Sequence, residues 1–142
     1  MFVMRMLKRQ GGFSLLELTA VVTITGTLSA VALPRYVDMM RSARVAKMEV
    51  ARRAVNESAQ MYHMKWMLAG SPAAATVLDG VQMSEAGFPT SAGILIAAGL
   101  ADNYDTRVAG VIAVDPQHPK CSLVYAPDSG RSVSNYADGS GC

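Results

Sequence analysis

The feature that most constrains the fold is an apolar run from Phe13 to Leu33, 21 residues that include one ionisable side chain, Glu17. At ~1.5 Å rise per residue, a helix of this length spans roughly 30 Å, the thickness of a bilayer's hydrocarbon core. A secretory signal peptide has a shorter apolar core, about 7 to 15 residues, with its cleavage site after that core. Here the small pair Gly11-Gly12 precedes the run. Cleavage after Gly12 would leave the apolar helix as the new N-terminus.

The charge distribution separates the start of the chain from the rest. The net charge is +2, but Arg5, Lys8 and Arg9 all precede Phe13 and no acidic residue lies among them. The remaining residues carry 10 basic and 11 acidic groups, and from Met67 onward there are three basic against seven acidic. The basic character therefore belongs mainly to the leader, which argues against nucleic acid as a partner.

The segment Lys8-Arg9-Gln10-Gly11-Gly12-Phe13-Ser14-Leu15-Leu16-Glu17 resembles the class III leader of type IV prepilins. The resemblance implies that a membrane prepilin peptidase cuts between Gly12 and Phe13 and methylates the amine of Phe13. Residues 1–12 would then be a removed leader, with Met1, Met4 and Met6 as alternative starts. Residues 13–34 would form a transmembrane and assembly helix. At the centre of a bilayer, a carboxylate such as that of Glu17 raises the free energy of the helix by roughly 2.5 kcal/mol or more, so it normally needs a partner.

The resemblance also assigns assembly roles to Glu17, Gly26 and Pro34. Glu17 would pair with the freed amine of Phe13, within one helix or between staggered neighbours, where it would set the axial register. The alternative is a carboxylate that simply lies at the headgroup level. Gly26 and Pro34 weaken helices by about 1 and about 3 kcal/mol. They match family positions where helix is lost on filament packing, although a simple kink explains them as well.

Beyond Pro34 the pattern becomes amphipathic and predicts that the helix continues as a stem over residues 35–69. Gly70-Ser71-Pro72 is a strong stop signal after about Leu68. The opposite faces of this helix carry charged side chains, so it should pack a head on one side. The predicted packing face consists of Val37, Met40, Met48, Ala51, Val55, Ala59, Tyr62 and Trp66.

Residues 70–142 are expected to form a β-rich head, which gives an α+β fold of the type IV pilin kind. Residues 73–99 should be a loop with one short helix near 92–100. Strands are predicted over 108–114, 121–125 and 131–136, with a turn at 115–119. The resulting antiparallel sheet of three or four strands would pack on the stem helix.

The only two cysteines, Cys121 and Cys142, lie in this head. In an oxidising compartment they should form a disulfide, and a metal pair without further ligands is a poor rival. The bridge would constrain the loop from Asp128 to Gly141. In pilins this loop is exposed and carries recognition, which makes Asn135 and Tyr136 candidate surface residues.

No enzyme is predicted, because the sequence contains no recognised catalytic motif. His63 and His118 lack neighbours at metal-ligand spacing and should be a stem-face and a turn residue. No cofactor is expected. A Ca²⁺ site at Asp102, Asn103 and Asp105, or at Asp138, is an alternative to ordinary turn chemistry.

Among pilins the chain is most similar to the mannose-sensitive haemagglutinin type. That likeness rests on Gly87-Phe88-Pro89-Thr90, Gly93, Ala97-Ala98-Gly99-Leu100 and the final Gly141-Cys142. It implies a self-assembling subunit that serves attachment and biofilm formation, with the inner-membrane pilus assembly machinery as partner and surface glycans or chitin as further candidates. The chain would lie in the inner membrane of a Gram-negative bacterium and then in an extracellular pilus. A pseudopilin of type II secretion and a monomeric signal-anchored periplasmic protein remain alternatives.

Overall fold

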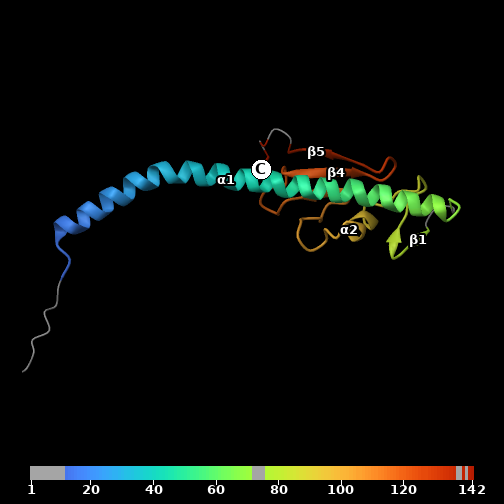
Figure 1. Cartoon of the computed structure of the whole chain (residues 1–142), viewed down its shortest axis with the longest axis horizontal. Coiled ribbons are helices and arrows are strands. Elements are labelled where there is room, and N and C mark those ends of the chain that lie inside the picture. Colours follow the sequence, from blue (N-terminus) through green and yellow to red (C-terminus); the bar gives the residue numbers. More distant parts are fainter. Residues whose placement is uncertain (1–11, 72–75, 137–138, 140) are drawn as a thin grey trace, which may run out of the picture. The chain divides into compact units, whose positions relative to one another are not determined.

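The structure, a computed structural model, describes residues 12–71, 76–136, 139 and 141–142. These residues contain seven elements in chain order. Figure 1 shows the long helix and, along its second half, the short elements that follow it. The seven elements are the helix α1 (Leu15–Leu68), strands β1 (Val77–Leu78) and β2 (Val81–Gln82), helix α2 (Gly93–Ala97), and strands β3 (Val111–Ala113), β4 (Ser122–Ala126) and β5 (Arg131–Ser134). This confirms the predicted α+β class with a long N-terminal helix and a small antiparallel sheet. Except for Gly12, the expected leader lies outside the described residues.

The chain divides into two compact units, Met1–Asp38 and Met39–Cys142. In the first unit the described residues from Leu15 onward form one continuous helix, and Gly26 and Pro34 both lie within it. The predicted loss of helix concerns a packed filament and stays a prediction. By length and composition α1 is apolar enough to cross a membrane, and it is the one such helix among the described residues.

The helix ends where the sequence predicts. Gly70 adopts φ 84° and Ser71 adopts φ 53°, left-handed conformations that cannot continue a helix. The amide of Gly70 donates to the carbonyl of Met67 at 3.0 Å, and the amide of Ser71 donates to the carbonyl of Trp66 at 3.1 Å. Carbonyls that the last turn would leave unpaired are thereby satisfied. Pro72, the third residue of the stop signal, lies outside the described residues.

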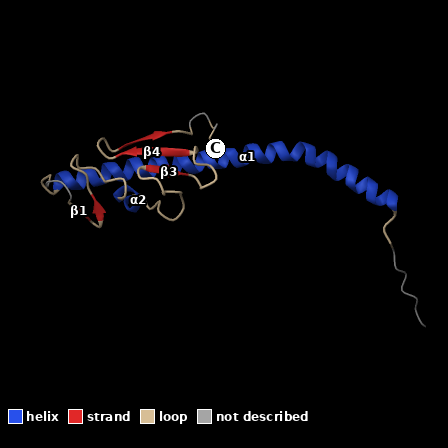
Figure 2. Cartoon of the chain, turned by 180° about the vertical axis from the view of Figure 1, so that it is seen from behind, coloured by secondary structure: helices blue, strands red, loops and turns tan. Residues whose placement is uncertain are grey.

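The three-stranded sheet has the order β3-β4-β5 with both pairs antiparallel. Its strands run alongside the second unit's part of α1 (Figure 2). All three strands and α2 were predicted, within a few residues at their ends. The prediction of loop and one short helix for residues 73–99 was incomplete, because β1 and β2 pair there as a hairpin, with Leu78 opposite Val81.

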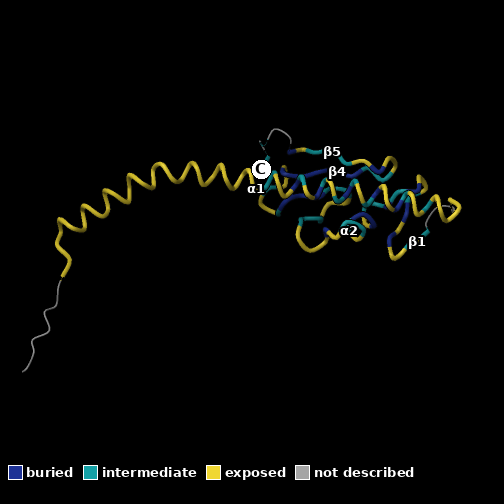
Figure 3. The backbone as a smooth tube through the Cα atoms, viewed as in Figure 1, coloured by how far each residue is buried: buried dark blue, intermediate teal, exposed yellow. Residues whose placement is uncertain are grey.

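The core of the second unit forms between one face of α1 and the sheet (Figure 3). Ile112 and Leu123 from the sheet are almost fully buried against the helix. The predicted helix face is buried from Met48 to Tyr62, in the set Met48, Ala51, Val55, Ala59 and Tyr62. The prediction was wrong for the first two residues of this face, because Val37 is 58% exposed and Met40 is 39% exposed. Val45 is the first hydrophobic residue along α1 that packs against this core, among the described residues.

Candidate functional site

The predicted processing position lies immediately before α1. Gly12, Phe13 and Ser14 are outside the helix and exposed. The hydroxyl oxygen of Ser14 accepts a hydrogen bond from the backbone amide of Glu17 at 3.2 Å, and the carbonyl of Ser14 accepts one from the amide of Leu18 at 3.1 Å. Ser14 is therefore the N-cap of α1. The Gly12–Phe13 bond is in irregular backbone, which a protease can bind without unwinding the helix.

Glu17 occupies the first turn of α1, where a negative charge is favoured by the helix dipole. The spacing from Ser14 to Glu17 is that of a capping box, in which a serine precedes a glutamate by three residues. An assembly role was predicted for Glu17, whereas the cap that Ser14 provides was not predicted. The pairing of Glu17 with a free amine on Phe13 stays a prediction, because Phe13 is joined to Gly12 here.

The first half of α1 presents an uncovered apolar surface. Every residue from Leu15 to Leu33 is exposed, with Leu16 at 80%, Val31 at 71% and Leu33 at 63%. Contiguous apolar surface of this extent marks a contact with a membrane or with other protein. Both environments lack water to satisfy polar groups, so the hydrogen bonds of this segment matter.

Four threonine hydroxyls in the apolar segment are satisfied by the helix itself. Each donates to a carbonyl three or four residues earlier, at distances between 2.7 and 2.9 Å. The donors are Thr19, Thr23, Thr25 and Thr27. Because each hydroxyl hydrogen already has an acceptor within the helix, these residues add little polarity to the surface of the segment. The sequence showed the threonines but not their bonding.

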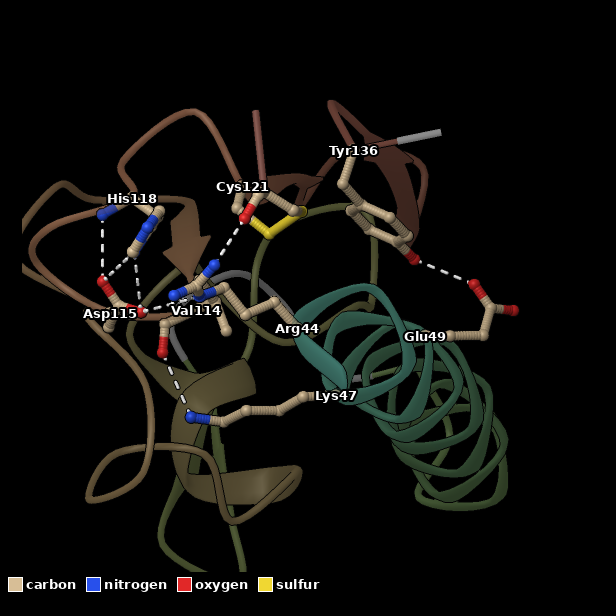
Figure 4. Close-up of a disulfide and its surroundings, with 9 residues drawn as sticks. Arg44, Lys47, Glu49, Val114, Asp115, His118, Cys121 and Tyr136 are labelled. Atoms are coloured by element: carbon tan, nitrogen blue, oxygen red, sulfur yellow. Dashed lines mark hydrogen bonds and ion pairs between the residues drawn. A yellow bond between two sulfur atoms is a disulfide. The ribbon is translucent and has the colours of Figure 1, made fainter. Parts of the chain in front are cut away.

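At the other end of the chain, a disulfide joins Cys121 to Cys142, as predicted, with their Cα atoms 4.7 Å apart (Figure 4). The bridge connects Cys142 to the start of β4. On the other side Arg44 of α1 donates from Nη1 to the main-chain oxygen of Cys142 at 2.8 Å. The C-terminal segment is thus attached both to the sheet and to the stem helix.

A second attachment comes from Tyr136, whose hydroxyl donates to Oε2 of Glu49 at 2.9 Å (Figure 4). Arg52 also binds both oxygens of Glu49, at 2.6 and 3.1 Å. The hydrogen bonds from Arg52 and Tyr136 lower the pKa of Glu49 to about 2. Burial, together with the hydrogen bond to Glu49, raises the pKa of Tyr136 to about 12.

These contacts correct one surface assignment. Tyr136 is 3% exposed and holds the loop to α1, so its side chain is a structural anchor and not a recognition group. Asn135 is exposed, and its role in recognition stays a prediction. The difference arises because a tyrosine in a polar loop gives no local sign of a distant carboxylate.

The loop predicted as an alternative Ca²⁺ site, residues 102–105, is in contact with two positively charged side chains, those of Arg107 and Lys47. Arg107 binds both carboxylate oxygens of Asp105, and this hydrogen bonding lowers the pKa of Asp105. The ammonium of Lys47 lies 2.7 Å from the main-chain oxygen of Asn103. Within the described part of the chain, no three His, Cys, Asp or Glu residues group as metal ligands. Asp138 lies outside that part.

Both histidines have structural contacts. Nδ1 of His63 lies 2.9 Å from the carbonyl oxygen of Gly87, and its ring stacks on Phe88 with centroids 4.2 Å apart. Trp66 packs against Gly87 so closely that a Cβ there would lie 2.5 Å from its ring. His118 is in the turn after β3 and contacts Asp115 at 2.8 Å. These positions agree with the predicted stem-face and turn residues.

Comparison of the chain with protein-family models, with curated proteins and with solved structures finds no match.

Proposed function

We propose that this chain is a type IV pilin of the type IVa class, closest to the mannose-sensitive haemagglutinin kind. A prepilin peptidase cleaves it between Gly12 and Phe13 and methylates Phe13. The inner-membrane assembly machinery then polymerises it into a pilus of a Gram-negative bacterium, which serves attachment and biofilm formation. Surface glycans or chitin are its proposed targets. The protein acts as a structural subunit and not as an enzyme.

The observation that carries this proposal is the junction at the start of α1. A glycine-phenylalanine bond in exposed, irregular backbone is followed at once by a capped helix with Glu17 in its first turn. The helix then exposes apolar side chains continuously to Leu33. A plain signal anchor needs the apolar helix but gives no reason for the Gly12–Phe13 junction or for a carboxylate at Glu17.

The second unit supports the same function. Its head is attached to α1 by a buried core, a disulfide and the contacts of Arg44 and Tyr136. These connections keep the head folded outside a membrane while the apolar segment is available for contacts with other copies. A subunit of a filament requires both properties.

The test is the intact mass and N-terminal sequence of the protein in filaments sheared from cells. We expect a chain that starts at Phe13 and is one methyl group heavier than calculated. Protein found only in the inner membrane, with the leader still attached, would contradict the proposal and favour a signal-anchored monomer. Short periplasmic assemblies without surface filaments would instead indicate a pseudopilin.

Two pairs of variants separate processing from assembly. Gly12→Val should leave the leader uncleaved, because a branched side chain at the cleaved bond obstructs the protease, whereas Gly11→Val should be processed. Glu17→Gln keeps the size of the side chain and removes its charge, so it should be processed normally and yield few filaments. Ser14→Ala removes only the cap and should still assemble. Equal filament yields from Glu17→Gln and from wild type would refute the assembly role.

A further inference from the structure

The last turns of α1 bring an imidazole and two thioether sulfurs to one side of the helix. His63 and Met67 are four residues apart, and Met64 and Met67 are three residues apart. At these spacings side chains are neighbours on a helix, with their Cβ atoms about 5–6 Å apart. A methionine side chain is unbranched and has three rotatable bonds, so its sulfur can turn towards a shared point. The three side chains can therefore approach one small ligand beside the helix.

The ring of His63 is held in the tautomer that a metal ligand needs. Its Nδ1 lies 2.9 Å from the carbonyl oxygen of Gly87. A carbonyl oxygen only accepts hydrogen bonds, so Nδ1 donates its proton, and Nε2 of the neutral ring keeps its lone pair. A histidine that binds a metal usually makes such a second hydrogen bond, which fixes the tautomer and the orientation of the ring. The stacking of His63 on Phe88, with ring centroids 4.2 Å apart, restricts the ring further.

The sulfur-bearing side chains are open to a ligand from solution. Met64 is 53% exposed and Met67 is 50% exposed, whereas Met48 and Met83 are buried in the core. His63 is half-buried beside the two exposed methionines. Met64 and Met67 can therefore turn towards a ligand without opening the hydrophobic core.

The charges of this region favour a soft ion with a single positive charge. Residues 60–68 contain no carboxylate, so the ligands on this side of the helix are neutral. Lys65 lies about 200° around the helix from His63 and is paired with Asp79 at 2.7 Å. Thioether sulfur selects copper(I) and imidazole also suits copper, whereas hard divalent ions prefer carboxylate and carbonyl oxygens. The two cysteines of the chain, which would compete for such an ion, are joined in the disulfide.

We propose that His63, Met64 and Met67 form a binding site for copper(I), held by Nε2 of the imidazole and by the two thioether sulfurs. The grouping of His, Cys, Asp and Glu residues considered above concerns the ligands of zinc and calcium and does not bear on thioether sulfur. All three ligands belong to the second unit, so the site requires only that this unit is folded. The inference does not depend on the proposed function.

Silver(I) is the first probe, because it prefers the same ligands and is not oxidised in air. The full-length chain in detergent, isotope-labelled at the methionine methyl groups and at the histidine ring nitrogens, is titrated with Ag⁺ and followed by NMR. The methyl signals of Met64 and Met67 and the Nε2 signal of His63 should shift together. His118 is the internal reference, because no methionine lies within four residues of it. The leader methionines give separate signals, so binding there is distinguished from binding at this site.

The decisive variant is Met64→Leu combined with Met67→Leu. Leucine is close to methionine in volume and in helix propensity, so the exchange removes the two sulfurs and little else. Met39→Leu combined with Met40→Leu is the matched control, since it removes two exposed methionines from the same helix at a place with no histidine within one turn. Loss of an outer partner of a metal ligand alone lowers affinity about 10- to 100-fold, so the double variant should bind Ag⁺ at least about 100-fold more weakly in calorimetry. The control should match wild type.

Copper(I) itself is measured without oxygen, by competition with the chelator bicinchoninate. Wild type and the control should take the ion from the chelator, and the double variant should not. Three results would overturn the inference: methionine signals that do not respond to Ag⁺, a response without any change at Nε2 of His63, or equal weakening of Ag⁺ binding in the control. Binding of Ag⁺ without binding of copper(I) would overturn the assignment to copper. Filament formation has no part in these measurements, so failure of the proposed function would be seen separately.

Discussion

Tyr136 and Glu49 are 87 residues apart in the sequence and 2.9 Å apart in the fold. Their contact shows how one hydroxyl can decide whether a loop belongs to the surface or to the core. The phenol fills a buried position against α1, and its hydroxyl donates a hydrogen bond to the carboxylate of Glu49, which Arg52 also binds. The segment after β5 is thereby fixed at a point that does not involve the disulfide.

The stability of the second unit at acid and at alkaline pH should depend partly on this pair. The pKa of Glu49 is lowered from 4.5 to about 2, so its contribution is complete above about pH 4.5 and is lost as the pH falls towards 2. The pKa of Tyr136 is raised from 10.0 to about 12, so the protonated phenol contributes fully below about pH 10 and loses this contribution as the pH rises towards 12. Thermal unfolding of the full chain in detergent, followed across this range, measures both losses.

Tyr136→Phe is the control for the pH profile. It keeps the buried ring and removes the hydroxyl, so both the acid loss and the alkaline loss should become smaller. The alkaline loss that remains should come from Tyr125, because burial raises its pKa to about 12 as well. An unchanged dependence on pH at both ends would show that the contact between Tyr136 and Glu49 does not control the stability of the loop.

At the scale of elements, the sequence predicted most of the structure because the signals were local. The helical period, the stop at Gly70-Ser71 and the runs that became β3, β4 and β5 are visible within short windows. The hairpin of β1 and β2 was also encoded locally but was missed. Asp79-Gly80 between apolar residues is a characteristic type I′ turn signal, and both residues adopt positive φ, 50° and 80°.

Other features could not be read from the sequence because they depend on distant partners. Periodicity predicted that Val37 and Met40 belong to the packed face, but burial also requires an element that covers them. The alignment of Val111, Val124 and Val133 across the sheet requires the register of three strands, which no single segment specifies. The hydrogen bond from Arg44 to Cys142 spans 98 residues and has no local signal.

The hairpin turn gives a prediction at this scale. Gly80→Ala should lower the free energy of unfolding by about 1–2 kcal/mol, because a residue with a Cβ is strained at a φ of 80°. Asp79→Asn should change it by less than about 1 kcal/mol, since asparagine also suits the turn and the exposed pair of Asp79 with Lys65 contributes little. Chemical denaturation of both variants checks the difference. Equal effects would mean that the side-chain pair, and not the turn, stabilises the hairpin.

At the scale of the whole molecule, the two units face different demands. The first unit offers continuous apolar surface and little internal packing beyond its own helix. The second unit has a core, and its last residues are joined to β4 by the disulfide. Stability in water therefore depends on the second unit, and the cysteine bridge closes its C-terminal part.

Removing the bridge should cost about 3 kcal/mol, the usual entropic effect of closing a loop of this size, here 21 residues. The appropriate variant is Cys121→Ala with Cys142→Ala, since Cys121 is fully buried and a serine hydroxyl there would lack a partner. Denaturation with and without reducing agent measures the effect. Reduced wild type and the double variant should agree, and the variant should not respond to reductant. A stability unaffected by reduction would show that Arg44 and Tyr136 hold the segment without the bridge.

The threonine hydroxyls of α1 that donate to carbonyls of the same helix have a consequence for moving this helix from one apolar environment to another. Moving a helix from lipid into the interior of a protein assembly is difficult when its polar groups must exchange one set of partners for another. Here the hydroxyls of Thr19, Thr23, Thr25 and Thr27 carry their acceptors with them. Such a helix can move between lipid and a protein interior without breaking any of these four hydrogen bonds. Their rearrangement therefore need not slow the transfer in either direction.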